Sequence, residues 1–233
     1  MAERVNNFPP LPQFLKIKPC FYQNIEEEIP AAHQQLVRRV YTLWMMYAAT
    51  LMANVISCIA WWAGGGDAIN FGFSLLWLIL FTPASYTCWF RPLYKAFRAD
   101  SSFNFMAFFF IFFVQCIFSC IQVLGINGWG TCGWFATVTF FSRNVASAVV
   151  MLITALLFTL VTVLMAVVLL KVHRLYRGGG GSMQRAQEEW STGLWKSAPV
   201  RDAGFNAVAQ AAQGPSLPQY PAAVPSYPDN SHW

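Results

Sequence analysis

Three basic residues, Arg91, Lys95 and Arg98, follow one another in a short segment between two long apolar stretches. If this segment is a helix, with about 100° of rotation per residue, the three side chains fall within about 60° of one another. Trp89 and Phe97 lie on the opposite side with other apolar residues. A helix with one basic and one aromatic face is typical of a membrane interface, where each cation near an acidic leaflet contributes roughly 1 kcal/mol. We therefore predict that Trp89, Arg91, Lys95, Phe97 and Arg98 bind anionic lipid.

An alternative reading of the same segment is that it only fixes the topology of the chain. A positive loop between two spans remains on the cytosolic side, and aromatic residues gather at the level of the headgroups without any specific ligand. The sequence leaves both readings open.

Residues suited to catalysis or to metal binding are scattered. His33, His173 and His232 are isolated and form no metal constellation with the cysteines. No nucleophile–base pair or carboxylate dyad falls where a pocket could form. We therefore expect neither an enzyme nor a cofactor or metal. The net charge of +5 comes without a groove of interleaved basic and aromatic residues, so nucleic acid is not an expected partner.

The elements around the basic segment follow from hydropathy. Of the 233 residues 56% are hydrophobic and 11% charged, whereas soluble domains have roughly 25% charged residues. Windows of about 20 apolar residues predict four spans, at about 41–62, 69–90, 105–126 and 146–170. We expect an all-α membrane protein, a bundle of four transmembrane helices with an amphipathic loop between spans two and three.

The predicted organisation has three parts. Residues 1–39 form an N-terminal segment, 40–171 the membrane domain, and 172–233 a tail that can begin with a short helix at 182–197. From about residue 203, alanine, glutamine, proline and tyrosine predominate, which is typical of disorder.

The orientation follows from the distribution of positive charge. Every Lys and Arg except Arg143 lies in the N-terminal segment, the loop between spans two and three, or the C-terminal part from Lys171 onward. Cytosolic loops carry the excess of Lys and Arg. Both termini are therefore expected in the cytosol.

The six cysteines give no disulfide framework. Only Cys132 falls clearly on the non-cytosolic side, and it can pair within the chain only if Cys58, near the same end of the first span, reaches it. Cys88 lies at a cytosolic membrane border and is a candidate for palmitoylation, the alternative being a buried thiol.

The spans contain no Asp, Glu, Lys, Arg or His. This disfavours pumps, proton-coupled carriers and voltage sensors. Gln115 and Gln122 lie seven residues apart on one helix face, and we expect them to form interhelical hydrogen bonds, with Asn54 as a partner. A polar transport path along these three residues is the alternative.

Two short motifs could recruit other proteins. Tyr22-Gln-Asn-Ile25 has the form of an endocytic sorting signal, which an adaptor binds as an extended strand. Leu217-Pro218-Gln-Tyr220 is similar to a weak proline–tyrosine ligand of WW domains. Neither motif is long enough to be specific.

Several longer motifs together resemble one family. They are Asn6-Asn-Phe-Pro-Pro-Leu-Pro12, Pro19-Cys-Phe-Tyr-Gln23, Cys88-Trp-Phe-Arg-Pro-Leu-Tyr-Lys-Ala-Phe-Arg98, Asp100-Ser-Ser-Phe-Asn104, Val172-His-Arg-Leu-Tyr-Arg177, and the run from Gly180-Gly-Ser182 through Gln187-Glu-Glu-Trp190 to Trp195. Over about residues 5–200 the chain resembles the secretory carrier-associated membrane proteins. It lacks N-terminal Asn-Pro-Phe repeats, as the short subgroup of that family does.

The resemblance implies a function that the residues alone do not. It implies a tetraspan protein of post-Golgi trafficking, endosomal recycling and regulated exocytosis, in which the loop at 88–98 engages phosphoinositide-bearing membrane. The implied locations are the Golgi and trans-Golgi network, recycling endosomes, secretory or synaptic-like vesicles and the plasma membrane. The resemblance implies that trafficking and fusion machinery are partners. It is also compatible with assembly of the protein into a homo- or hetero-oligomer. The alternatives are a channel or carrier and a purely structural vesicle component.

Overall fold

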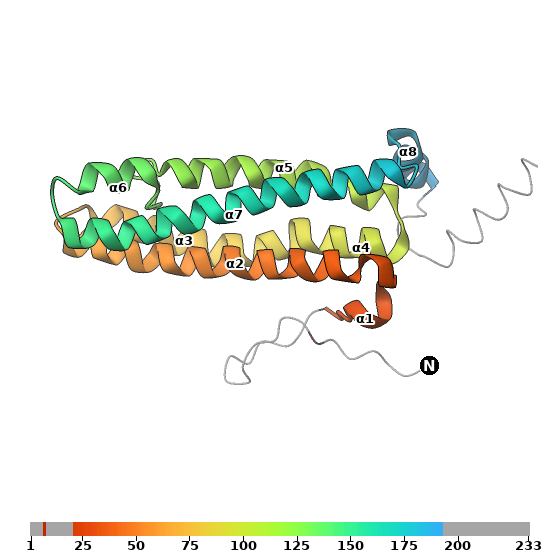
Figure 1. The fold of residues 1–233 in the computed structure, drawn as a ribbon, viewed down its shortest axis with the longest axis horizontal. Helices are drawn as coiled ribbons and strands as arrows, with labels where there is room; N and C mark the ends of the chain where they lie inside the picture. Colours follow the sequence, from red (N-terminus) through yellow and green to blue (C-terminus); the bar gives the residue numbers. More distant parts are fainter. Residues whose placement is uncertain (1–6, 8–20, 193–233) are drawn as a thin grey trace, which may run out of the picture.

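The protein is a bundle of four long helical segments that run side by side (Figure 1). The computed structural model describes Asn7 and residues 21–192. The four segments are α2 (Ala31–Ala63), α3 (Ala68–Ser85) with its continuation, α5 (Ser102–Leu124) and α7 (Val145–Gly178). Helix α2 packs against α3 and α7, and α5 packs against α7 and the continuation of α3, so the four segments close into a bundle. The predicted all-α fold is confirmed.

All four segments are long and apolar enough to cross a membrane. Helices α2 and α7 have 33 and 34 residues, so at about 1.5 Å per residue they exceed the roughly 30 Å of a bilayer core. Both extend beyond the predicted spans because polar residues continue the helical pattern. Helix α2 begins directly after Pro30, and α7 continues through Lys171, Arg174 and Arg177 to Gly178.

The second segment differs from its prediction. Helix α3 continues without a loop into η2, a π-helix at Tyr86–Phe90, and then into α4 (Arg91–Ala99). The π-helical turn follows closely after Pro83, whose ring disturbs the regular pattern of helical hydrogen bonds. The Trp44 indole N–H donates to the Thr82 carbonyl oxygen at 3.2 Å. The expected amphipathic loop is therefore the end of a continuous helix.

The turn from α4 into α5 is very short. Asp100 ends α4 in the left-handed conformation, with φ of 45°. Ser101 then caps α5, because its hydroxyl accepts the backbone N–H of Asn104 at 3.3 Å. This fixes the end of α4 relative to the start of α5.

The two ends of the bundle carry different short helices and connections (Figure 1). We call the end that carries α1 (Ile25–Glu28), α4 and α8 (Met183–Thr192) the basic end. The opposite end carries α6 (Trp134–Phe140) and the connections 64–67 and 125–133.

Aromatic residues fill the interior of the bundle. Tyr47, Phe108, Phe112 and Phe158 have no exposed surface. Many large apolar side chains on the outside, such as Ile79 and Phe110, are exposed. A surface of this kind suits contact with lipid tails, as expected of a multi-pass membrane protein.

Candidate functional site

The apolar side of the basic segment lies inside the protein. Trp89, Phe90, Leu93 and Phe97 are almost completely buried, and they pack against α2 and α5. The Trp89 ring centroid lies 4.8 Å from that of Phe112. The proposed immersion of Trp89 and Phe97 in lipid is therefore not the arrangement in the structure. The periodicity of the segment correctly marks an apolar face, but the environment of that face is the helix bundle.

The basic side of α4 points away from the core, and its three cations have different surroundings. The Arg91 guanidinium lies 3.8 Å from the centroid of the Phe21 ring, a cation–π contact. Arg98 forms an ion pair with Glu28 at 3.3 Å. For Lys95 no ion pair occurs with any residue that the structure describes. Burial of part of the Lys95 side chain, then repulsion by Arg91 and Arg98, lowers the pKa of its ammonium group.

The segment before α2 is fastened to this helix. The Tyr94 hydroxyl donates to the Glu28 carboxylate at 2.6 Å and accepts the backbone N–H of Asn24 at 3.0 Å. One residue earlier, the Gln23 side-chain oxygen accepts the Tyr86 hydroxyl at 2.7 Å. These contacts hold residues 21–29 beside η2 and α4, although they are about 70 positions away in the sequence.

A cavity of about 200 Å³ lies between the N-terminal segment and α4. It is lined by Phe21, Tyr22, Gln23, Tyr86, Arg91, Tyr94, Lys95 and Arg98. Three cations and a set of hydroxyl and amide groups thus face one small space. Guanidinium, ammonium and hydroxyl donors are the groups that bind phosphate oxygens. The chemistry of the cavity is therefore that of an anion site.

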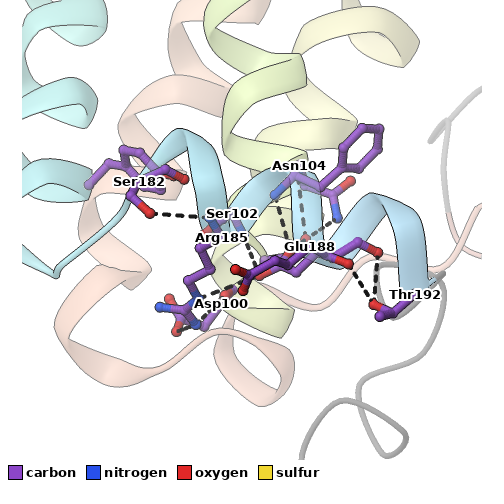
Figure 2. Close-up of polar contacts among 11 residues, drawn as sticks. Asp100, Ser102, Asn104, Ser182, Arg185, Glu188 and Thr192 are labelled. Atoms are coloured by element: carbon purple, nitrogen blue, oxygen red, sulfur yellow. Dashed lines mark hydrogen bonds and ion pairs between the residues drawn. The ribbon is translucent and has the colours of Figure 1, made fainter. Parts of the chain in front are cut away.

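Helix α8 packs against the start of α5 and the turn that precedes it (Figure 2). The side chain of Glu189, which is 4% exposed, accepts the Ser101 hydroxyl at 2.8 Å and the backbone N–H groups of Ser102 and Phe103 at 3.1 and 3.0 Å. A carboxylate at this position satisfies free N–H groups at the start of α5 and interacts favourably with the helix dipole.

Arg185 strengthens the same junction. Its guanidinium lies 3.1 Å from the Asp100 carboxylate and 3.6 Å from that of Glu189. Helix α8 is thereby attached to both sides of the turn between α4 and α5 (Figure 2). The predicted short helix at 182–197 corresponds to α8, whose residues Met183–Thr192 are described. Its capping role was not foreseen, because a Glu in a polar tail segment carries no sign of its partner.

Asn54 and Gln122, two of the three amide residues singled out in the spans, have different partners. The Asn54 side chain donates to the Gly130 carbonyl oxygen at 2.7 Å and accepts the Cys132 N–H at 2.9 Å, so it holds the connection before α6. Gln122 accepts the Tyr47 hydroxyl at 3.3 Å. Gln115 is buried too, and among the described residues no hydrogen bond joins it to Asn54. Gln122 therefore forms an interhelical hydrogen bond as expected, but its partner is Tyr47 on α2 and not Asn54.

The other candidate residues have the following positions. Cys88 is exposed on η2, one helical turn before Arg91. Tyr22 lines the cavity, whereas Ile25 begins α1 and packs against the core, so the motif is not extended here. Leu217, Pro218 and Tyr220 lie outside the described residues, as does the region from residue 203 onward. Within the described part of the chain, no group of three or more His, Cys, Asp and Glu side chains could hold a metal ion.

The fold and these contacts define a four-helix, multi-pass membrane protein with a basic cluster at one end. Comparison with known proteins gives the family. The model of the SCAMP family matches residues 5–179, and the chain belongs to this family. No solved structure matches it.

Curated relatives match over nearly the whole length. The chain is 57% identical over 233 residues to a secretory carrier-associated membrane protein 4 of Pongo abelii, and 59% identical over 234 residues to that of Mus musculus, with full coverage of both chains in each case. It is also 59% identical to a secretory carrier-associated membrane protein 5 of Xenopus tropicalis, over 97% of each chain. These names indicate a trafficking protein in general and no catalytic family.

Proposed function

We propose that the protein acts in post-Golgi trafficking, endosomal recycling and regulated exocytosis, and that its basic end faces the cytosol and binds phosphoinositide headgroups. Family membership supports the general role in vesicle trafficking. The proposed locations are the Golgi and trans-Golgi network, recycling endosomes, secretory or synaptic-like vesicles and the plasma membrane. The two tails would contact the trafficking and fusion machinery.

The observation that carries the lipid-binding proposal is the basic cavity. Arg91, Lys95 and Arg98 line one space of about 200 Å³ together with tyrosine hydroxyls. The three cations of the cavity follow directly after Phe90, where the long apolar stretch ends, so they lie at the expected level of the headgroups. A phosphorylated inositol ring offers several phosphate groups to such a cluster, and Arg can bind each phosphate through two parallel hydrogen bonds.

The mechanism differs from that of an amphipathic helix that inserts into the bilayer. Since Trp89 and Phe97 pack in the core, the attraction rests on charge and hydrogen bonds. Binding should therefore weaken as salt increases, because salt screens exposed charges. Headgroup chemistry, and not acyl-chain packing, should determine the preference.

The test uses the whole chain, because an isolated peptide of residues 88–99 would expose Trp89 and Phe97 and bind lipid through them. The protein is reconstituted in neutral nanodiscs, and binding of soluble inositol trisphosphate is measured by calorimetry. The triple variant Arg91→Ala, Lys95→Ala, Arg98→Ala should bind about 100-fold more weakly if each cation contributes about 1 kcal/mol.

A matched control removes the same charge at the same end. The triple variant Lys171→Ala, Arg174→Ala, Arg177→Ala changes three exposed cations on α7, which do not line the cavity. Its affinity should fall only a few-fold through the long-range field. Equal losses in both variants would reject a specific site and leave the α4 cations as topology signals.

Acylation of Cys88 is a separate proposal on the same surface. Its thiol is exposed on η2 beside the basic face, and a palmitoyl chain there would enter the adjacent leaflet. Acyl-exchange labelling of the protein from cells should give a signal that the Cys88→Ser variant loses. An unchanged signal in that variant would assign acylation to another cysteine.

A further inference from the structure

Two cysteine thiols meet at the opposite end of the bundle. Cys58 lies between one and two turns before the end of α2, and Cys132 lies in the connection between α5 and α6. Their Sγ atoms lie 3.5 Å apart, and both residues are buried, at 0% and 2% exposure. The two residues are 74 positions apart in the sequence, so it is the fold that brings their side chains together.

The backbone around this pair is held by hydrogen bonds that do not involve sulfur. Asn54 lies one turn before Cys58 on the same face of α2, and its amide binds the Gly130 carbonyl oxygen and the Cys132 N–H at 2.7 and 2.9 Å. Asn70 on α3 accepts the N–H groups of Gly128 and Gly130 at 3.0 and 3.1 Å. The connection is thus attached to two helices, and Cys132 is directed at Cys58.

Close packing limits how the connection can be placed. A Cβ atom on Gly130 would lie 2.6 Å from the Ser74 backbone nitrogen, and one on Gly133 would lie 2.4 Å from the Gln122 carbonyl oxygen. The residues on both sides of Cys132 therefore touch neighbouring backbone directly. A rigid frame of this kind keeps the two thiols together, with their Sγ atoms 3.5 Å apart, against about 2.05 Å in a disulfide.

We propose that Cys58 and Cys132 form a disulfide in the mature protein. The proposal goes beyond lipid binding, and it rests on the proposed orientation, in which this end faces an oxidising lumenal or extracellular space. The bond would join α2 covalently to the connection before α6. The other cysteines that the structure describes are Cys88, Cys116 and Cys120, and none of them has a second thiol within hydrogen-bonding distance.

The reaction is a thiol–disulfide exchange with a disulfide oxidant, either glutathione disulfide or a protein disulfide of the secretory pathway. One cysteine loses its proton, and its thiolate attacks the oxidant to give a mixed disulfide and one released thiol. The thiolate of the second cysteine then attacks the sulfur of the first cysteine in this mixed disulfide, and the second thiol of the oxidant is released. The S–S bond of the pair forms, and two electrons and two protons leave in the two reduced thiols of the oxidant.

The experiment compares unreduced and reduced full-length protein. Cells are quenched in acid, and the protein is denatured, alkylated with one maleimide, reduced, and alkylated with a second, distinguishable maleimide. Peptide mass spectrometry should find Cys58 and Cys132 with the second label, and Cys116 and Cys120 with the first. Nonreduced digests should contain a Cys58–Cys132 linked peptide.

Single variants give the matched control. In Cys58→Ser, Cys132 should take the first label, and in Cys132→Ser, Cys58 should do so, because each has lost its partner. If either thiol keeps the second label in such a variant, it is paired elsewhere and the proposal is overturned. The first label on both cysteines of the wild-type protein would overturn it as well.

A second arm separates this inference from the proposed function. The purified, reduced protein in nanodiscs is incubated with glutathione disulfide, and the linked peptide should form within minutes to hours. No linked peptide in this arm would show that the geometry does not permit the bond. If the purified protein forms the linked peptide but the protein from cells has free thiols, the disulfide does not form in cells. That result would also count against the proposed orientation, in which this end faces the lumenal or extracellular side. Headgroup binding at the basic end is measured independently of both results.

Discussion

The Glu28 carboxylate accepts a 2.6 Å hydrogen bond from the Tyr94 hydroxyl and lies 3.3 Å from the Arg98 guanidinium. Its side chain is 4% exposed, whereas that of Arg98 is 44% exposed. An acidic residue from the N-terminal segment is thus bound into the basic face of α4. It lowers the positive potential of the cavity and competes with any external anion for Arg98.

Replacing Glu28 with Gln should strengthen anion binding. The amide keeps a hydrogen-bond acceptor for Tyr94 but removes the negative charge beside Arg98. We expect about a 2- to 5-fold higher affinity for inositol trisphosphate, since a nearby charge contributes up to about 1 kcal/mol. Glu27→Gln is the matched control, because Glu27 is exposed and contacts the Tyr22 hydroxyl instead. Equal affinities of the two variants would contradict a local role of Glu28.

Glu189→Ala should release α8 from the start of α5. The change removes the acceptor of three hydrogen bonds with Ser101, Ser102 and Phe103, at a cost of about 1–3 kcal/mol for the donors left unpaired. Hydrogen exchange should become faster at residues 183–192 in the variant. Glu188→Ala changes an exposed neighbour and should leave the exchange of α8 nearly unchanged. Protection of α8 in both variants would rule out the capping role.

Asn54→Ala should destabilise the opposite end of the bundle. The Cys132 N–H would lose the Asn54 side-chain oxygen, and the Gly130 carbonyl oxygen would keep only the weak, 3.7 Å contact from the Cys58 thiol. Each buried group left without a good partner costs about 1–3 kcal/mol. Thermal unfolding in detergent should show a clear fall in the midpoint. Thr50→Ala, one turn earlier on α2, removes a hydroxyl that bonds only within its own helix and should have a smaller effect.

Gly125→Ala tests the tight contact that brings α6 back towards α5. Gly125 has a φ of 70°, and an added Cβ would lie 2.3 Å from the Cα of Gly133. We expect a loss of several kcal/mol or failure to fold, since both strain and overlap oppose the change. Gly72→Ala on α3 meets no atom within 4 Å and should be neutral or slightly stabilising. The yield of folded protein after detergent extraction measures both.

The channel alternative predicts solute flux. Both polar atoms of the Asn54 amide are occupied by the connection before α6, and Gln122 contacts Tyr47. Asn54 is therefore engaged by the connection and is not free to line a path with the glutamines. Purified protein in liposomes should therefore give no solute-selective conductance, and a conductance that Gln122→Leu alters would favour the channel.

Hydropathy alone predicts the four helices and their order. It underestimates the length of α2 and α7, because a hydropathy window ends where Arg38 or Lys171 enters, while the helical backbone continues. The residues of the basic face could also be found from their spacing. The partner of the apolar face could not, since Trp89 and Phe97 are equally compatible with lipid and with a protein core.

The polar contacts were harder to predict, because a side chain in a sequence does not name its partner. The amide of Asn54 suits another helix as well as a loop, and the choice depends on where residues 130–132 lie. Glu28 and Glu189 are ordinary acidic residues in polar segments. Only the fold shows that each is buried against a specific group of the basic end.

The unbroken helix from Ala68 to Ala99 has 32 residues, about 48 Å at 1.5 Å per residue, against roughly 30 Å of hydrocarbon. No hinge at a loop separates its lipid-facing part from its cations. Any change in tilt or in bilayer thickness therefore moves Arg91, Lys95 and Arg98 up or down relative to the phosphate plane. Membranes of the secretory pathway thicken by a few ångströms towards the cell surface. If the proposed headgroup site operates, its contact with phosphate would depend on the thickness of the membrane around this continuous helix.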